Sequence, residues 1–167
     1  MAKANWRKWT GDASSALVAG ACACDDVRFE IDVPARWAWH DHSRASRHAH
    51  GCAYVTYGGS WRSRFRVLDG DANIARFEYP EAGTMRSFCA RCGTPLFYER
   101  ARSPQMVNIP RALFTSRTGR EARYHVALEE APDWAYRGDA LAPLKGYPGV
   151  MWQRPRQKKP PNSRSDF

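Results

Sequence analysis

Apolar and polar residues alternate over short stretches in the middle of the chain. Residues 27–31 read VRFEI, in which every second side chain is apolar, as in a strand with one buried face. Comparable stretches rich in β-branched or aromatic residues follow at 53–57, 65–68, 74–79, 85–88, 95–99 and 106–109. Gly, Pro and Asp separate them at intervals of about 8–12 residues, which is typical of antiparallel sheets. The pattern predicts a mostly β protein, with the stretch at 53–57 ending at Gly58 and Gly59.

Helix is expected to be scarce. One short helix is predicted over residues 43–50, because Arg and Ala favour helix and Gly51 can end it. The 167 residues, 43% of them apolar, suffice for one domain with a buried core. No apolar stretch approaches the roughly 18–20 residues of a membrane-spanning helix. The N-terminus lacks the apolar stretch of a secretory signal, so we expect a cytoplasmic protein.

The formal net charge of +9 is concentrated at the two ends of the chain. Residues 1–10 and 152–167 hold eight of the 26 basic residues and one of the 17 acidic ones, which leaves a net +2 between them. The C-terminal run is rich in Pro, Lys, Arg and Ser, a composition typical of solvated tails. We therefore predict one domain over residues 12–145, an N-terminal tail at 1–11 and a basic C-terminal tail at 146–167. Nucleic acid is expected to bind only weakly, through these tails.

Four of the five cysteines form two close pairs. Cys22 and Cys24 are separated by one residue, and Cys89 and Cys92 by two, while Cys52 stands alone. Two such pairs far apart in sequence suit a tetrahedral zinc site, which links distant segments of a small domain. Disulfides or unconnected core thiols are the alternatives, although disulfides are disfavoured in the cytoplasm. Cys52 fits a small buried residue better than a nucleophile.

The cysteine segments resemble those of a known family. The sequence GACAC at 20–24, followed by VRF at 27–29, is similar to the opening motif of the glutathione-dependent formaldehyde-activating enzymes, which include the centromere protein V domain. SFCARCGTPLFYE at 87–99 and HVALEEAPDW at 125–134 resemble later segments of that family. The resemblance implies an Mss4-like β-tent of antiparallel sheets held together by one structural zinc. Its ligands would be Cys22, Cys24, Cys89 and Cys92. Asp25 departs from the pattern, because the family has glycine there.

The resemblance also implies a second, catalytic zinc, but its ligands are altered here. The three family cysteines correspond to Asp41, Ser43 and Ser46, while His42, Arg47 and the pair His50-Gly51 stay in register. Neutral serine hydroxyls are poor substitutes for thiolates, so a second zinc is doubtful. The candidate catalytic positions carried over from the family are Asp41, His42, Ser43, Ser46 and His48.

Four of the five histidines fall within eleven residues, at 40, 42, 48 and 50. Three readings stay open for them: a rebuilt metal site, an acid–base or hydrogen-bonding role, and ordinary surface residues. Arginines offer a further ligand-binding element, because their forked donors match carboxylates and glutathione carries two. Arg44 and Arg47 flank the altered positions, and Arg62, Arg64 and Arg66 alternate along the next segment. The alternating set also suits the solvent face of a strand, which is the ordinary reading of such a pattern.

Two main functions follow. The first is a carbon–sulfur lyase that adds glutathione to formaldehyde or another aldehyde, with its catalytic zinc ligands replaced. The second is a non-catalytic zinc-binding module for a small anion, a protein or a polyanion. A small-molecule thiol or aldehyde is the expected partner and glutathione the expected co-substrate. No membrane partner is indicated, and a homo-oligomer stays open.

Overall fold

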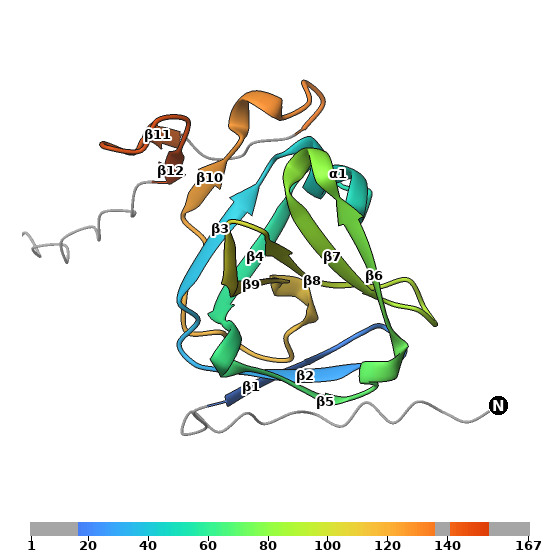
Figure 1. Ribbon diagram of the computed structural model, residues 1–167. Coiled ribbons are helices and arrows are strands. Elements are labelled where there is room, and N and C mark those ends of the chain that lie inside the picture. The colour runs from blue at the N-terminus through green and yellow to red at the C-terminus, as the bar shows by residue number, and fades with distance from the viewer. Residues whose placement is uncertain (1–16, 136–140, 154–167) are drawn as a thin grey trace, which may run out of the picture.

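The computed structural model describes residues 17–135 and 141–153, which form two β-sheets and one short α-helix (Figure 1). The strands are β1 Leu17–Ala21, β2 Arg28–Asp32, β3 Trp37–Asp41, β4 Val55–Trp61, β5 Phe65–Asp69, β6 Ile74–Tyr79, β7 Thr84–Cys89, β8 Pro95–Arg100, β9 Ser103–Pro110, β10 Tyr124–Val126, β11 Leu141–Pro143 and β12 Met151–Gln153. The helices are α1 Arg44–His50 and the 3-10 turns η1 Arg62–Arg64, η2 Asp71–Asn73, η3 Pro80–Ala82, η4 Arg111–Leu113 and η5 Leu128–Glu130. Within these residues, no helix is both long and apolar enough to cross a bilayer.

The two sheets differ in size. The small sheet has the strand order β1-β2-β5, and the large one the order β11-β12-β10-β3-β4-β9-β8-β7-β6. Neighbouring strands are antiparallel except β3 and β10, which run parallel. The small sheet lies across one end of the curved large sheet (Figure 1). The prediction of a mostly β protein built from antiparallel sheets is confirmed.

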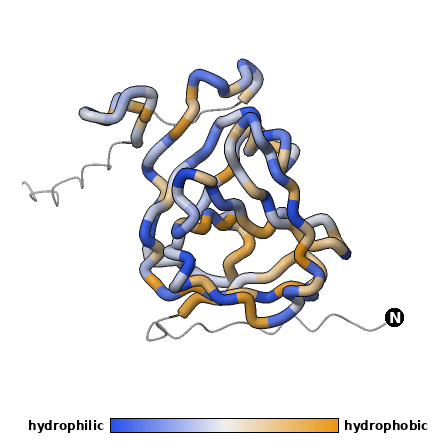
Figure 2. The backbone as a smooth tube through the Cα atoms, in the orientation of Figure 1, coloured by the Kyte–Doolittle hydropathy of each residue, from blue (hydrophilic) through white to orange (hydrophobic). Residues whose placement is uncertain are grey.

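The main core lies where the small sheet faces the large one. On β2, Phe29 and Ile31 are fully buried while Arg28 is exposed, which is the alternation that the sequence shows. They pack with buried residues of the large sheet, including Leu96, Val107 and others in the same cluster. Hydrophobic positions are concentrated in this part of the molecule (Figure 2). This core holds the turns that carry the cysteines in place.

The predicted helix is present as α1. The hydroxyl of Ser43 accepts a hydrogen bond from the Ser46 N–H at 3.3 Å, and so caps the N-terminus. Gly51 ends the helix in the left-handed region, with φ of 60°. The helix directly follows β3, and this places the first turn of α1 beside the end of that strand.

The predicted end of one strand is wrong. β4 continues through Gly58 and Gly59 as far as Trp61. The large sheet needs a position without a side chain at Gly59. A Cβ atom on Gly59 would lie only 1.6 Å from Nε1 of Trp37, so the Trp37 indole occupies that space. Here glycine marks a close approach inside a strand and does not mark a turn.

Only part of the two predicted tails lies within the described residues. Within the predicted C-terminal tail, residues 151–153 form β12, which pairs with β10 and β11. The predicted tail at 1–11 and the basic residues from 154 onward lie outside the described residues.

Candidate functional site

The four paired cysteines come together in one cluster. Their Sγ atoms all lie within 4.8 Å of one another. Cys22 and Cys24 belong to the turn between β1 and β2, whereas Cys89 ends β7 and Cys92 lies in the turn that leads to β8. The Sγ atom of Cys24 is 3.5 Å from that of Cys22 and 3.9 Å from that of Cys89. Tetrahedral zinc with Zn–S bonds of about 2.3 Å separates its sulfurs by about 3.8 Å, so the cluster fits one zinc ion.

The first cysteine turn is closed by backbone hydrogen bonds. The Cys22 N–H donates to the Val27 carbonyl at 3.0 Å, and the Asp25 N–H donates to the Cys22 carbonyl at 3.1 Å. The Val27 N–H points at the Cys22 sulfur, 3.3 Å away. Asp25, at the position where the resemblance implies a glycine, has a φ of 61°. The turn is therefore formed without glycine, at the strain that a side chain meets in this region.

The second cysteine turn has the same design and does carry a glycine. Gly93 has a φ of 73°, and its N–H donates to the Cys89 carbonyl at 2.8 Å. Thr94 joins the two turns, because its hydroxyl accepts from the Ala23 N–H at 3.1 Å and lies 3.1 Å from the Cys92 sulfur. Hydrogen bonds from the hydroxyl and backbone of Thr94 lower the pKa of the Cys92 thiol to about 6. This favours the thiolate, which is the form that binds metal.

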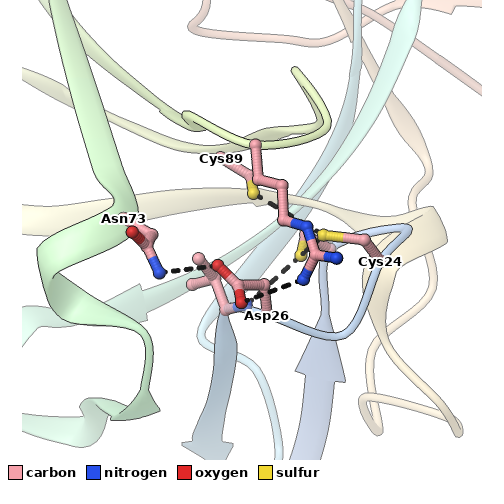
Figure 3. A network of polar contacts seen from close by, with 7 residues as sticks. Cys24, Asp26, Asn73 and Cys89 are labelled. Carbon is pink, nitrogen blue, oxygen red and sulfur yellow. Dashed lines mark hydrogen bonds and ion pairs between the residues drawn. The ribbon is translucent and has the colours of Figure 1, made fainter.

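A polar network supports the cluster from outside (Figure 3). The Asp26 carboxylate accepts from Nδ2 of Asn73 at 2.7 Å and from Nη1 of Arg91 at 3.5 Å. The Ala90 N–H donates to the Asn73 carbonyl at 2.8 Å, so η2 is tied to both cysteine turns. Cys52 lies elsewhere, where burial raises the pKa of its thiol, so it lacks the thiolate character of a nucleophile.

The three positions that the resemblance assigns to a second zinc also converge, but as a hydrogen-bonded group. Asp41 ends β3 and is 4% exposed, and Ser43 and Ser46 belong to the cap and first turn of α1. Oδ1 of Asp41 accepts from the Ser43 N–H at 2.9 Å, and Oδ2 accepts from the Ser46 hydroxyl at 3.1 Å. The side chains available as metal ligands are one carboxylate and two neutral hydroxyls. The carboxylate already accepts a hydrogen bond from each serine. These residues do not fit a catalytic zinc.

The group has three further members, Arg86, Tyr57 and His50, of which the sequence singles out only His50. Nη2 of Arg86 lies 3.2 Å from the Ser46 hydroxyl, and the Tyr57 hydroxyl lies 3.4 Å from it. Tyr57 also lies 3.0 Å from Nε2 of His50 and 3.3 Å from Nη1 of Arg86. Burial, with a smaller effect of the Arg86 charge, lowers the pKa of His50 to about 4, so this imidazole is neutral at pH 7. The sequence points to His50, because it stays in register with the family motif, but it holds no comparable indication for Arg86 or Tyr57.

A cavity of about 720 Å³ opens beside this group. Its lining includes Asp41, Ser43 and Ser46, the acids Glu81 and Glu130, and four arginines: Arg44, Arg86, Arg100 and Arg102. The cavity therefore joins the altered site to a concentration of guanidinium groups, of which only Arg44 was singled out from the sequence.

Other candidate residues lie away from this cavity. The Arg47 guanidinium donates to the carbonyls of His42 at 3.0 Å and Glu130 at 2.9 Å, so it links α1 to its neighbours. His48 is exposed on the outside of α1. His42 is fully buried, and its Nε2 lies 2.9 Å from Nδ1 of His125. The structure does not bring His42, Arg47 or His48 to the cavity beside Asp41.

His42 belongs to a cluster of three histidines between β3 and β10. The ring centroid of His125 lies 4.6 Å from that of His40 and 5.1 Å from that of His42. Burial, followed by the charges of His40 and His42, lowers the pKa of His125 to about 4. Among the His, Cys, Asp and Glu side chains of residues 17–135 and 141–153, the four cysteines form the one group whose ligand atoms are close enough to hold a metal. The three histidines do not form such a group. Of the four histidines that the sequence singles out, His40, His42 and His50 each lie within hydrogen-bonding distance of another side chain, whereas His48 is exposed.

The alternating arginines form ion pairs on the protein surface. Arg62 pairs with Glu99 at 2.7 Å, Arg64 with Asp32 at 3.3 Å, and Arg66 with Glu30 and Asp32 at 2.7 and 2.6 Å. Their charges are thus balanced by neighbouring strands, as expected for a solvent face.

Two sheets, antiparallel except for the β3–β10 pair and joined through a four-cysteine cluster, define a small β protein with a candidate structural zinc site. The model of the family named "Glutathione-dependent formaldehyde-activating enzyme" matches residues 17–130, and the chain belongs to this family. A crystal structure of a Rhodobacter sphaeroides protein is similar, with a TM-score of 0.51 and 20% identity. The match covers 59% of this chain and 88% of that one, and it shows a shared fold. No curated protein is significantly similar to the chain.

Proposed function

We propose that this chain is a zinc-binding member of the family whose altered second site binds a small anionic ligand without a catalytic zinc. The observation that supports this most strongly is the pair of hydrogen bonds from Ser43 and Ser46 to the carboxylate of Asp41. A metal at this place would have to break both bonds and would gain only neutral hydroxyls as further ligands.

The arginines around the cavity indicate the ligand class. Within the part of the chain that the structure describes, no ion pair neutralises Arg44, Arg86, Arg100 or Arg102. Guanidinium groups bind carboxylates through paired hydrogen bonds. Glutathione and its aldehyde adducts carry two carboxylates, and the family name links relatives to glutathione and formaldehyde. We therefore assign the cavity to a small carboxylate of this kind.

Catalysis of the family reaction should be weak or absent. In that reaction the thiol sulfur bonds to the aldehyde carbon, and the thiol proton ends on the carbonyl oxygen. A zinc ion would polarise the carbonyl or lower the thiol pKa. Without one, the protein adds little to a thiol that is already partly ionised at neutral pH. Any residual proton transfer would fall to Tyr57 and His50, which lie at the altered site, rather than to His42 or His48.

Metal content and activity test the first half of the proposal. Purified protein should contain one zinc per chain and should not accelerate S-hydroxymethylglutathione formation above the spontaneous rate. The variant Asp41→Cys/Ser43→Cys/Ser46→Cys, which restores the family ligands, should bind a second zinc. A matched control, Ser43→Ala/Ser46→Ala, should not. Two zinc ions in the unmodified protein, with acceleration abolished by Asp41→Ala, would overturn the proposal.

Titration calorimetry with glutathione tests the second half. Arg100→Gln removes a guanidinium that lines the cavity and should weaken glutathione binding at least tenfold. Arg76→Gln is the matched control, since Arg76 is exposed on β6 and does not line the cavity. Equal binding by both variants would place the ligand elsewhere.

A further inference from the structure

A second cavity, of about 950 Å³, lies on the other face of β3. Successive residues of a strand point to opposite faces. Ala38 and His40 line this second cavity, whereas Asp41 lines the first, and the two cavities share no lining residue. Thr56 of β4 and the segment from 117 to 124 complete the walls. The second cavity is therefore independent of the altered metal site.

Four arginines line the second cavity: Arg111, Arg117, Arg120 and Arg123. Glu121 is the one acidic residue among the lining residues, and it already accepts from Nη2 of Arg123 at 2.9 Å. Arg120 donates through Nε to the Ala35 carbonyl at 2.8 Å. Three of the four positive charges thus have no carboxylate partner within the described residues.

The guanidinium groups of Arg111 and Arg117 have no hydrogen-bond or ion-pair partner among the described residues. Arg117 is exposed, whereas Arg111 is only partly accessible, and burial lowers the pKa of its guanidinium. A partly desolvated cation without a counter-ion is costly unless an anion balances it. His40 adds no positive charge at pH 7, because burial lowers its pKa, and Nδ1 lies 2.9 Å from the Thr56 hydroxyl.

We propose that this second cavity binds a multiply charged oxyanion, such as a phosphate ester or a small polycarboxylate. Guanidinium groups recognise both through forked N–H donors, and the net charge of the lining favours ligands with two or more negative charges. The Thr56 hydroxyl and the His40 ring provide uncharged hydrogen-bonding groups at the inner wall. The volume leaves room for a ligand larger than an inorganic ion.

Calorimetry at constant ionic strength tests the proposal with two probes, pyrophosphate and citrate. At least one probe should bind saturably to the full chain, and the probe that binds identifies the phosphate or the carboxylate source. The variant Arg111→Gln/Arg117→Gln should weaken that binding at least tenfold. The control Arg62→Gln/Arg76→Gln removes the same charge away from both cavities and should bind like the unmodified protein. Circular dichroism confirms that each variant is folded, and Arg117→Glu alone, at an exposed position, replaces the double variant if it unfolds.

Two results would overturn the proposal. One is the absence of saturable binding by either probe. The other is equal weakening by the two double variants, which would mean that the anion responds only to net charge. Binding of a long RNA without binding of either small probe counts as the first of these results, because it would reflect the basic tails or a general polyanion surface.

Discussion

The cysteine cluster and the Asp41 group occupy similar places in the fold but differ in their capacity to bind a metal. Each gathers short-spaced polar residues at the end of a strand and in the turn that follows. In the cluster, four soft sulfurs lie within 4.8 Å of one another, and Thr94 lowers the pKa of one of them. In the Asp41 group, the carboxylate accepts from the Ser43 backbone N–H and from the Ser46 hydroxyl. Convergence alone does not make a metal site, because the donors must also be charged and unoccupied.

The largest expected effect comes from breaking the cysteine cluster. Cys89 is fully buried beside the main core, and Cys89→Ser should leave the domain unfolded or molten and without zinc. At such sites much of the metal-binding free energy, of order 10 kcal/mol in small zinc domains, is folding free energy. Thermal unfolding followed by circular dichroism, with zinc content by mass spectrometry, provides the measurement. Cys52→Ser should melt close to the unmodified protein, and an unchanged melting temperature for Cys89→Ser would contradict the zinc assignment.

A smaller loss of folding stability is expected when the Asp41 group is changed. Ser46→Ala removes the hydroxyl that Asp41, Arg86 and Tyr57 share, and it leaves buried polar atoms without that partner. A change of this kind costs about 1–3 kcal/mol, and the variant should still fold and keep its zinc. Urea unfolding measures the cost, with Ser63→Ala at an exposed position as the reference. A loss of zinc from Ser46→Ala would show that the two regions depend on each other.

Acid should weaken the contact between β3 and β10. The His125 imidazole takes up a proton near pH 6.5 in the unfolded chain but only near pH 4 when folded. The unfolded state therefore binds more protons as the pH falls from 6.5 towards 4, and stability decreases over that window. Because the ring is partly exposed, the expected loss is about 1 kcal/mol.

The difference between two unfolding profiles isolates this effect. His125→Gln removes the titrating group that faces His40 and His42, so the unmodified protein should lose more stability than this variant between pH 6.5 and 4. His48→Gln, at an exposed position, should follow the unmodified protein. Parallel profiles for all three proteins would show that His125 does not titrate with a depressed pKa.

The smallest change in folding stability is expected from a substitution at Asp25. Its φ of 61° strains a side chain, and Asp25→Gly would relieve that strain. Glycine also gains more freedom in the unfolded chain, and this offsets part of the gain. We expect the variant to be more stable by a few tenths of a kcal/mol, measured as a small rise in melting temperature. A clear loss of stability would mean that the Asp25 side chain itself supports the turn.

Features that depend on local spacing can be predicted from the sequence. The cysteine pairs were visible because zinc turns need two thiolates within a few residues, and α1 was visible from its composition and Gly51. β3 was missed, because in WAWHD its polar and aromatic residues do not alternate clearly. Arg86 and Tyr57 were missed for another reason. They reach the Asp41 group only because the large sheet brings β4 and β7 close to α1. Pairing between strands that are distant in sequence cannot be predicted from a local pattern.

The parallel pairing of β3 with β10 has a consequence for the order in which the chain folds. The contact between His42 and His125 joins residues 83 positions apart, and β11 and β12 are attached to the sheet through β10. Contacts between distant segments form late, because a long loop must close before they add any stability. During synthesis, β3 can pair with β4 as soon as both strands are available, and its other edge then stays open until residues 124–126 have been made. The side of β3 along which β10 lies (Figure 1) is thus the last to be covered.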